Sequence, residues 1–302
     1  MNQNDLMTSV TSESEKGREP LKVAVGQFIS VADVDTNLDT MDRLANKAAS
    51  EGSQLIVFPE AAMYQWNTSS ETIARIATEE GERYIHRSQD IAIRNNIALI
   101  VGGYSKNPDG GRPFNRLTAI NNRGEILTSY DKVHLYDAYS WVESDTVTPG
   151  PIQGDFSELG VFVINGWRIG LLNCYDLRFP ELARGLCERG ADVITMSSAW
   201  VAGPLKEFHL STLATARAIE NTAYVVVANQ PPPLSTGNSS IISPFGTNIA
   251  GVDLAEDIAT AELREDILES SRAQLPIRLN RRYAASSLPA GTQTLTSAQR
   301  EG

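Results

Sequence analysis

The chain has 302 residues, and 41% of them are hydrophobic, which is enough for a full core. Its 37 acidic and 26 basic side chains give a net charge of −11, which repels nucleic acid and anionic membrane surfaces. We therefore expect chemistry on a small molecule, with no nucleic-acid or membrane partner. The two cysteines, Cys174 and Cys187, form no disulfide framework and suit a reducing cytosol, so we expect a cytoplasmic protein.

Both ends of the chain differ in composition from the part between them. Residues 1–20 are polar and lack a basic stretch followed by an apolar one, so they are predicted to be a disordered tail and no signal peptide. Residues 285–302 are rich in Ala, Ser, Thr, Gly and Gln, which predicts a flexible tail or one that drapes over a partner subunit. One domain, residues 21–284, is predicted between the tails. Its longest apolar run, residues 223–228, is far shorter than the roughly 20 residues that span a bilayer.

The first half of this domain alternates strands with helices. Hydrophobic periodicity and turn residues predict strands over 21–28, 54–58 and 97–104, helices over 37–51 and 83–95, and a hairpin of strands 116–121 and 125–130.

The second half repeats this order. It predicts strands over 167–172, 191–196, 223–229, 238–243, 247–250 and 258–263, and helices over 180–189 and 206–221. Two similar β-α-β-α-β-β halves indicate two sheets packed face to face with helices outside. Because neither sheet can hide both of its faces alone, we predict one α/β domain in four layers, an α-β-β-α sandwich.

Three chemically complementary side chains come just after predicted strands. Glu60 follows the second strand, Lys132 follows the hairpin, and Cys174 follows strand 167–172. In open α/β sheets the working crevice lies outside the carboxyl ends of the strands. Singly, these residues could be a loop cap, a solvated lysine and a small buried apolar residue. Together, a carboxylate can take the thiol proton, an ammonium can stabilise an oxyanion, and a thiolate can attack a carbonyl carbon.

Cys174 lies on the turn between a strand and a helix. Pro180 is well placed to open that helix, and the positive helix end and a nearby cation are expected to favour the thiolate. Asp176 and Arg178 are interpreted as a charge pair that fixes this turn. Cys187 falls inside the predicted helix and is interpreted as core packing.

Five ordered motifs within residues 21–265 resemble the nitrilase superfamily of carbon–nitrogen hydrolases. They are residues 58–60 (FPE), 130–134 (YDKVH), 174–182 (CYDLRFPEL), 216–221 (ARAIEN) and 239–246 (SSIISPFG). The resemblance implies a Glu-Lys-Cys triad at Glu60, Lys132 and Cys174. Residues 141–150 are similar to the stretch that carries a second active-site glutamate, which implies that role for Glu143. The family fold is the α-β-β-α sandwich predicted above.

The nucleophile motif is similar to that of the omega-amidase and deaminated-glutathione amidase branch. The resemblance implies an amidase that hydrolyses a small linear carboxamide to acid and ammonia through a cysteine thioester, without cofactor or metal. Two departures touch the pocket: Asn238 stands where relatives often have histidine, and the loop 200–204 lacks a usual Thr-Gly pair. Hydrolysis of N-carbamoyl amino acids or of nitriles therefore remains an alternative.

Several further residues are candidates for binding substrate. Tyr64, Trp66, Trp200 and Phe208 lie on loops after the strands that carry or adjoin the catalytic groups, and core packing is an equally good interpretation of each. The backbone N–H of Tyr175 is placed to bind an oxyanion.

Other classes of function remain open at this point. A Cys-His hydrolase could use His134 or His209 as base, although the three histidines, which include His86, have no metal-binding spacing. An acyltransferase with an amine acceptor, or a binding member without catalysis, are further alternatives. The resemblance also implies a homodimer or larger assembly through residues 180–189.

Overall fold

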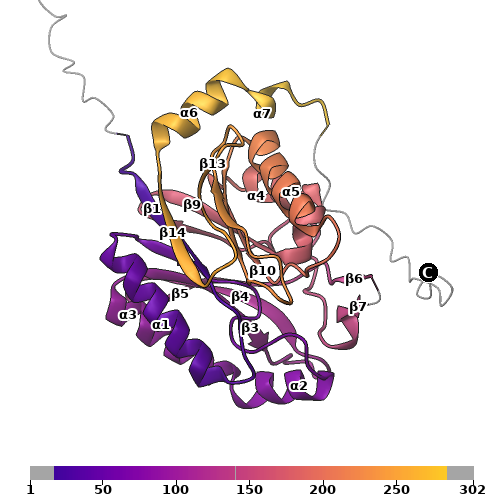
Figure 1. Ribbon diagram of the computed structural model, residues 1–302. Helices are drawn as coiled ribbons and strands as arrows, with labels where there is room; N and C mark the ends of the chain where they lie inside the picture. The colour runs from indigo at the N-terminus through magenta and orange to yellow at the C-terminus, as the bar shows by residue number, and fades with distance from the viewer. Residues whose placement is uncertain (1–16, 140, 284–302) are drawn as a thin grey trace, which may run out of the picture.

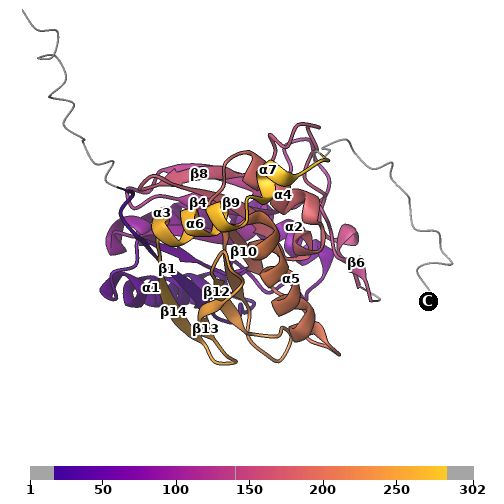
Figure 2. The same cartoon turned by 90° about the horizontal axis from the view of Figure 1, so that it is seen from above.

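The computed structural model describes residues 17–139 and 141–283, and Figure 1 shows its layers. Two six-stranded sheets face each other, and helices cover the outer face of each sheet (Figures 1 and 2). The predicted α-β-β-α sandwich is therefore confirmed. The expectations for residues 1–16 and 284–302 lie outside the described residues.

The first half of the chain supplies five strands and three helices. They are β1 (Leu21–Gln27), α1 (Val34–Ser50), β2 (Leu55–Val57), α2 (Ser70–Glu79), α3 (Gly81–Asn95), β3 (Ala98–Ser105), β4 (Phe114–Ile120) and β5 (Ile126–Asp131). A short hairpin and a 3-10 turn then lead into the second half, and these are β6 (Asp137–Ala138), β7 (Trp141–Val142) and η1 (Glu143–Asp145).

The second half builds the other sheet and then returns to the first. Its elements are β8 (Val161–Ile164), β9 (Trp167–Asn173), η2 (Cys174–Arg178), α4 (Pro180–Glu188), β10 (Val193–Ser198), α5 (Lys206–Asn221), β11 (Tyr224–Asn229), β12 (Ser239–Ile242) and β13 (Asn248–Val252). The last elements are β14 (Asp257–Leu263), α6 (Glu265–Gln274) and α7 (Ile277–Asn280).

The two sheets have the same internal plan. Their orders are β14-β1-β2-β3-β4-β5 and β13-β12-β11-β10-β9-β8, each with parallel strands in the centre and antiparallel strands outside them. The predicted repeat is therefore correct, with one exchange. The last strand, β14, leaves the second half and pairs with β1, Leu263 opposite Leu21. The equivalent edge of the second sheet is filled by β8, which the sequence pattern did not reveal.

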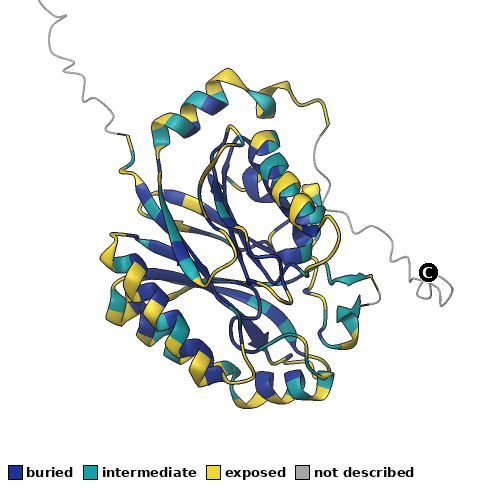
Figure 3. Cartoon of the chain, in the orientation of Figure 1, coloured by how far each residue is buried: buried dark blue, intermediate teal, exposed yellow. Residues whose placement is uncertain are grey.

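The central strands of both sheets, β1 to β3 and β9 to β11, are almost wholly buried on both faces (Figure 3). In β1, Val23 and Val25 belong to the core between the sheets, whereas Ala24 faces the helices of the first sheet. This double burial explains why the strands read as near-continuous apolar runs. Among the described residues, no helix is long and apolar enough to span a membrane.

Besides the four-residue α7, two helices, α2 and α6, were not predicted from the sequence. α2 is short, and its start depends on Ser69, whose hydroxyl accepts from the Thr72 backbone N–H. α6 follows β14 directly and exposes most of its surface, so its apolar periodicity is weak. Neither changes the layers.

Candidate active site

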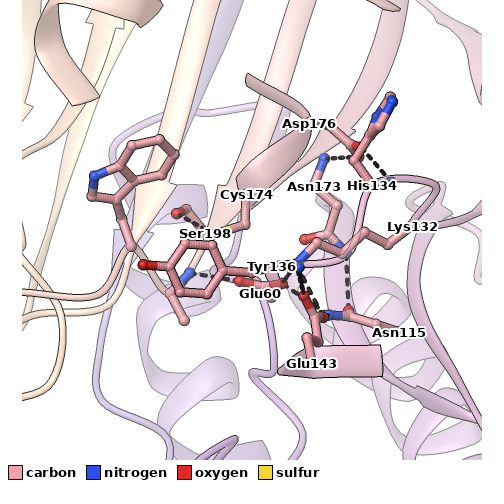
Figure 4. Close-up of polar contacts among 12 residues, drawn as sticks. Glu60, Asn115, Lys132, His134, Tyr136, Glu143, Asn173, Cys174, Asp176 and Ser198 are labelled. Atoms are coloured by element: carbon pink, nitrogen blue, oxygen red, sulfur yellow. Dashed lines mark hydrogen bonds and ion pairs between the residues drawn. The ribbon is translucent and has the colours of Figure 1, made fainter. Parts of the chain in front are cut away.

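The carboxyl ends of β2 and β9 and the end of β5 meet at one pocket. Cys174 directly follows β9, Lys132 directly follows β5, and Glu60 lies three residues beyond β2. All three side chains line this pocket together with Glu143 from η1 (Figure 4). The structure thus brings the four predicted catalytic side chains to one place.

The Lys132 ammonium is held between two carboxylates. Its Nζ donates to Glu60 Oε1 at 2.8 Å and to both oxygens of Glu143 at 2.8 and 3.0 Å. The side chains of Lys132, Glu60 and Glu143 are only 1%, 7% and 12% exposed. Buried charges persist when they are paired and hydrogen-bonded, and this array meets that requirement.

Asn115, which the sequence analysis missed, joins these groups to the nucleophile's strand. Its Nδ2 donates to Glu60 Oε1 at 2.8 Å and to Glu143 Oε1 at 3.0 Å, and its Oδ1 accepts from Asn173 Nδ2 at 2.9 Å. Glu143 Oε2 also accepts from the Tyr136 backbone N–H at 2.6 Å. Both carboxylates are therefore fixed by donors from several elements.

The two carboxylates that share the Lys132 ammonium have pKa values shifted in opposite directions. Burial acts to raise the pKa of Glu60, but the charge of Lys132 and its hydrogen bond outweigh burial and lower that pKa. Burial and the charge of Glu60 instead raise the pKa of Glu143. Burial acts to lower the pKa of Lys132, yet both glutamates together raise it well above its ordinary value. Glu60 is thus the ionised carboxylate suited to accept a proton.

Cys174 lies on a strained turn. Its φ of 49° is in the left-handed region, which side chains rarely adopt, and a short 3-10 turn separates it from α4. Asn173 and Asp176 close this turn as a capping box. Such a turn at the top of a sheet presents a nucleophile to a crevice.

The partners of Asp176 correct the expected charge pair with Arg178. Asp176 is fully buried, and it accepts from the Tyr130 hydroxyl at 2.8 Å and from His134 Nδ1 at 3.0 Å. The Arg178 guanidinium instead lies over the Trp200 ring, 4.7 Å from its centroid. Asp176 fixes the turn, and Arg178 is free to face the pocket.

The resting thiol of Cys174 also differs from expectation. Burial, followed by the charge of Glu60, raises its pKa far above the ordinary value, and the opposing effect of Lys132 is smaller. The direction of this shift favours the neutral thiol, opposite to the effect expected of the helix end and the lysine. A proton acceptor beside the sulfur would be needed for Cys174 to act as a nucleophile, and Glu60 is the neighbouring ionised carboxylate.

Aromatic side chains form the walls of the pocket. Trp66, Trp141, Tyr136, Tyr175 and Trp200 all line it, so Trp66, Tyr175 and Trp200 lie where they were expected. Two other candidates lie elsewhere. Tyr64 is buried in the core between the first sheet and its helices, and Phe208 on α5 is 63% exposed outside the pocket.

Two further cations, Arg178 and Lys206, line the pocket. One guanidinium nitrogen of Arg178, Nη2, is buried and has no hydrogen-bond partner. Lys206 Nζ donates to the Tyr136 hydroxyl at 2.8 Å and lies 3.7 Å from the ring centroid of Tyr139. Burial and the charge of Arg178 lower the pKa of Lys206. We call these two residues the cationic wall; Arg178 was interpreted from sequence as structural, and Lys206 was not predicted to reach the pocket.

Neither His134 nor His209 lines the pocket. His134 is oriented by Asp176 and stacks on Phe179 at 3.6 Å between centroids, which leaves it outside the pocket lining. His209 is on α5, and its buried Nδ1 has no partner. Within the described ranges, no cluster of His, Cys, Asp or Glu could hold a metal ion. The geometry thus gives the Cys-His alternative no support.

Comparison with known proteins agrees with this geometry. The family model for carbon-nitrogen hydrolases matches residues 22–272. The deaminated glutathione amidase of Escherichia coli O157:H7 is 35% identical over 262 residues, which cover 87% of this chain and 97% of that protein.

Solved structures of proteins from the same superfamily are also similar to this chain. The NitFhit protein of C. elegans superposes with a TM-score of 0.81 at 27% identity, over 89% of this chain and 67% of that one. A mutant amidase from Nesterenkonia in complex with butyramide has a TM-score of 0.72 at 26% identity, over 85% of this chain and 96% of that one. The chain therefore belongs to the carbon-nitrogen hydrolase family, within the nitrilase superfamily, and is a carbon–nitrogen hydrolase enzyme.

Proposed function

We propose that this enzyme is an amidase that hydrolyses a small linear carboxamide to acid and ammonia, with Cys174 as nucleophile. The observation that carries the proposal is the convergence of an ionised Glu60, the Lys132 ammonium and the Cys174 thiol in one aromatic-walled pocket. The names of its relatives, deaminated glutathione amidase and amidase, point to the same reaction.

In the acylation step, Glu60 takes the Cys174 proton while Sγ bonds to the amide carbon. The oxyanion that forms is stabilised by the Lys132 charge and by the Tyr175 backbone N–H, at about 3 kcal/mol for a well-placed donor. When the carbon–nitrogen bond breaks, Glu60 returns the proton to the nitrogen and ammonia leaves. The acyl group remains on Cys174 as a thioester.

In the deacylation step, Glu60 takes a proton from water, whose oxygen bonds to the thioester carbon. The carbon–sulfur bond then breaks, and Glu60 returns the proton to Sγ. Lys132 is charged throughout, because both glutamates hold its pKa high. Glu143 acts on Lys132 and positions it, since both of its carboxylate oxygens bond to Nζ.

The cationic wall favours a substrate that carries a carboxylate beyond its amide. A buried guanidinium nitrogen without a partner is costly, and an anionic group on the ligand would satisfy it. Lys206 adds a second positive charge from the start of α5. We therefore propose an omega-amide of a carboxylic acid as the substrate class.

The test is ammonia release from a panel of amides with parent and Cys174→Ala enzymes. The panel holds omega-amides of keto acids, deaminated glutathione, butyramide, N-carbamoyl amino acids and nitriles, and free cysteinylglycine is measured for deaminated glutathione. We expect turnover of the acidic amides and none by the mutant. Release from carbamoyl compounds or nitriles alone would replace the amidase by those alternatives. If folded protein turned over none of these compounds, an acyltransferase or a binding role would be favoured.

A second comparison tests the cationic wall itself. Arg178→Ala should raise KM for an acidic amide roughly 10- to 100-fold, the loss expected for hydrogen bonds to a charged group. KM for neutral butyramide should change little, because butyramide has no carboxylate. An equal rise in KM for both substrates would assign Arg178 to packing on Trp200 instead.

A further inference from the structure

The strand beside the nucleophile's strand ends in a buried serine. β10 runs parallel to β9, and the pairing of Ser197 with Asn173 brings Ser198 next to Cys174. Ser198 Oγ donates to Cys174 Sγ at 3.3 Å, and the residue is 0% exposed (Figure 4). Ser198 lies outside the five sequence motifs that resemble the nitrilase superfamily.

We propose that Ser198 is a further catalytic residue, whose hydroxyl stabilises the negative charge on Cys174 Sγ each time the sulfur loses its proton or its acyl group. The inference rests on the proposed role of Cys174 as nucleophile. A hydrogen bond to an anion is stronger than one to a neutral acceptor, so the hydroxyl favours the thiolate over the thiol.

The surroundings of the sulfur explain why such a donor matters. Sγ is buried and lies near the Glu60 carboxylate, and both effects oppose negative charge there. Lys132, the cation that favours it, already donates to two glutamates. The Ser198 hydroxyl makes a direct contact with the sulfur.

The next residue ties the base to the same strand end. The backbone N–H of Ala199 donates to Glu60 Oε2 at 3.0 Å. Consecutive groups of one rigid segment thus bind the nucleophile and its base, and they hold Sγ and the carboxylate at a fixed separation. Ala199 and Trp200 line the pocket, whereas Ser198 is fully enclosed beside the sulfur. Its removal should therefore lower kcat and leave KM unchanged.

The strand supplies a matched control. Thr195 is also 0% exposed, and its hydroxyl donates to the Gly170 carbonyl at 3.0 Å, away from the sulfur. Thr195→Val deletes a buried hydroxyl from the same strand with little change of shape. Any general effect of losing such a hydrogen bond should appear in both variants.

The experiment measures alkylation of Cys174 by iodoacetamide against pH, followed by mass spectrometry of the peptide that contains it. This readout separates Cys174 from Cys187. We expect Ser198→Ala to react roughly tenfold more slowly, with its profile shifted to higher pH, as for loss of a hydrogen bond to a charged group. Its kcat for amides should fall by a similar factor, while Thr195→Val alkylates at the parent rate.

Parent-like alkylation in folded Ser198→Ala would overturn the inference, and so would equal slowing in Thr195→Val. If Ser198→Ala does not fold, Ser198→Thr and Ser198→Val form an isosteric pair that differs in the hydroxyl. The threonine variant should then react about tenfold faster than the valine variant, and equal rates would overturn the inference. Alkylation displaces iodide and needs no amide hydrolysis, so a Ser198 effect without amide turnover would remove the proposed function and keep the thiolate donor.

Discussion

Glu143 contacts the Lys132 ammonium directly. Its two oxygens take two of the hydrogen bonds of the ammonium, and the backbone N–H of Tyr136 fixes it in turn. The Glu143 side chain therefore sets where the positive charge of Lys132 stands. This geometry favours a positioning role over direct contact with the amide.

Replacing Glu143 by glutamine should lower kcat roughly 10- to 100-fold, because one charged partner of Lys132 is lost. KM should change less, since the carboxylate does not form the cationic wall. Steady-state kinetics measure both, with Glu125→Gln as the control, because Glu125 pairs with Arg123 on the surface. Full turnover by Glu143→Gln would remove Glu143 from the active site.

Lys206 predicts a pH dependence specific to acidic substrates. Because burial and the charge of Arg178 lower its pKa, Lys206 loses its charge at a lower pH than an ordinary lysine. KM for an acidic amide should therefore rise on the alkaline side, while KM for butyramide stays flat. Lys206→Arg, which keeps its charge, should flatten the rise. A rise of equal size with both substrates would contradict the assignment of Lys206.

At the scale of elements, β3 shapes the loop that carries Glu60. A Cβ on Gly102 would lie 2.7 Å from the Pro59 carbonyl oxygen and 2.9 Å from Glu60 Cα. Backbone atoms at such distances must move, so only glycine lets this loop pass across the strand. The position of Glu60 thus depends on a residue far from it in sequence.

Gly102→Ala should displace Glu60 and lower kcat by about 100-fold, the size expected for a misplacement of roughly 1 Å. The matched control is Gly103→Ala, whose Cβ would meet only the side chains of Tyr84 and Met63. Circular dichroism and kinetics of both variants separate displacement from unfolding. Parent-like kcat in folded Gly102→Ala would show that the loop has room to adjust.

Local sequence pattern predicts some residues of the site and misses others. Glu60, Lys132 and Cys174 each follow an apolar strand, and strand ends can be recognised from local pattern. Asn115 reaches the site because β4 pairs with β3 in a register that places it opposite Tyr104. Lys206 meets Tyr136 across 70 residues of sequence. Such long-range pairings decide the pocket wall, and local pattern does not contain them.

At the scale of the whole molecule, Arg18 also makes contacts with residues far from it in sequence. Arg18, in the stretch expected to be a loose tail, donates to Glu265 at 2.6 Å and to Asp192 at 2.5 Å. Its guanidinium also lies 4.5 Å from the ring centroid of Trp167. It therefore ties the start of the domain to the second sheet and to α6.

Arg18→Ala should reduce the free energy of unfolding by about 2 kcal/mol, because hydrogen bonds to two carboxylates are lost. The control is Arg43→Ala, since the Arg43 side chain is 59% exposed and pairs with Glu256 on the surface. Its loss should cost less than about 1 kcal/mol. Urea unfolding measures the free energy of unfolding of both variants. Equal, small losses would show that Arg18 does not stabilise the domain and would support the prediction of a loose tail for residues 17–20.

Assembly is a second property of the whole molecule. We propose, from the family resemblance, a homodimer or larger assembly through α4 and its surroundings. Phe208 on the neighbouring α5 is 63% exposed and Leu205 is 69% exposed, which leaves apolar surface for a partner chain. Sedimentation velocity at micromolar concentration should show two chains or more. A single species of 32.9 kDa would contradict the proposal.

The proposed mechanism requires the substrate's acyl group to pass through Cys174. The most direct measurement is mass spectrometry of enzyme quenched with acid during turnover of an acidic amide, with the peptide that contains Cys174 isolated. We expect this peptide to carry the acyl group, and we expect Cys174→Ala to carry none and to release no ammonia. Ammonia release at the parent rate by Cys174→Ala would contradict the thioester mechanism.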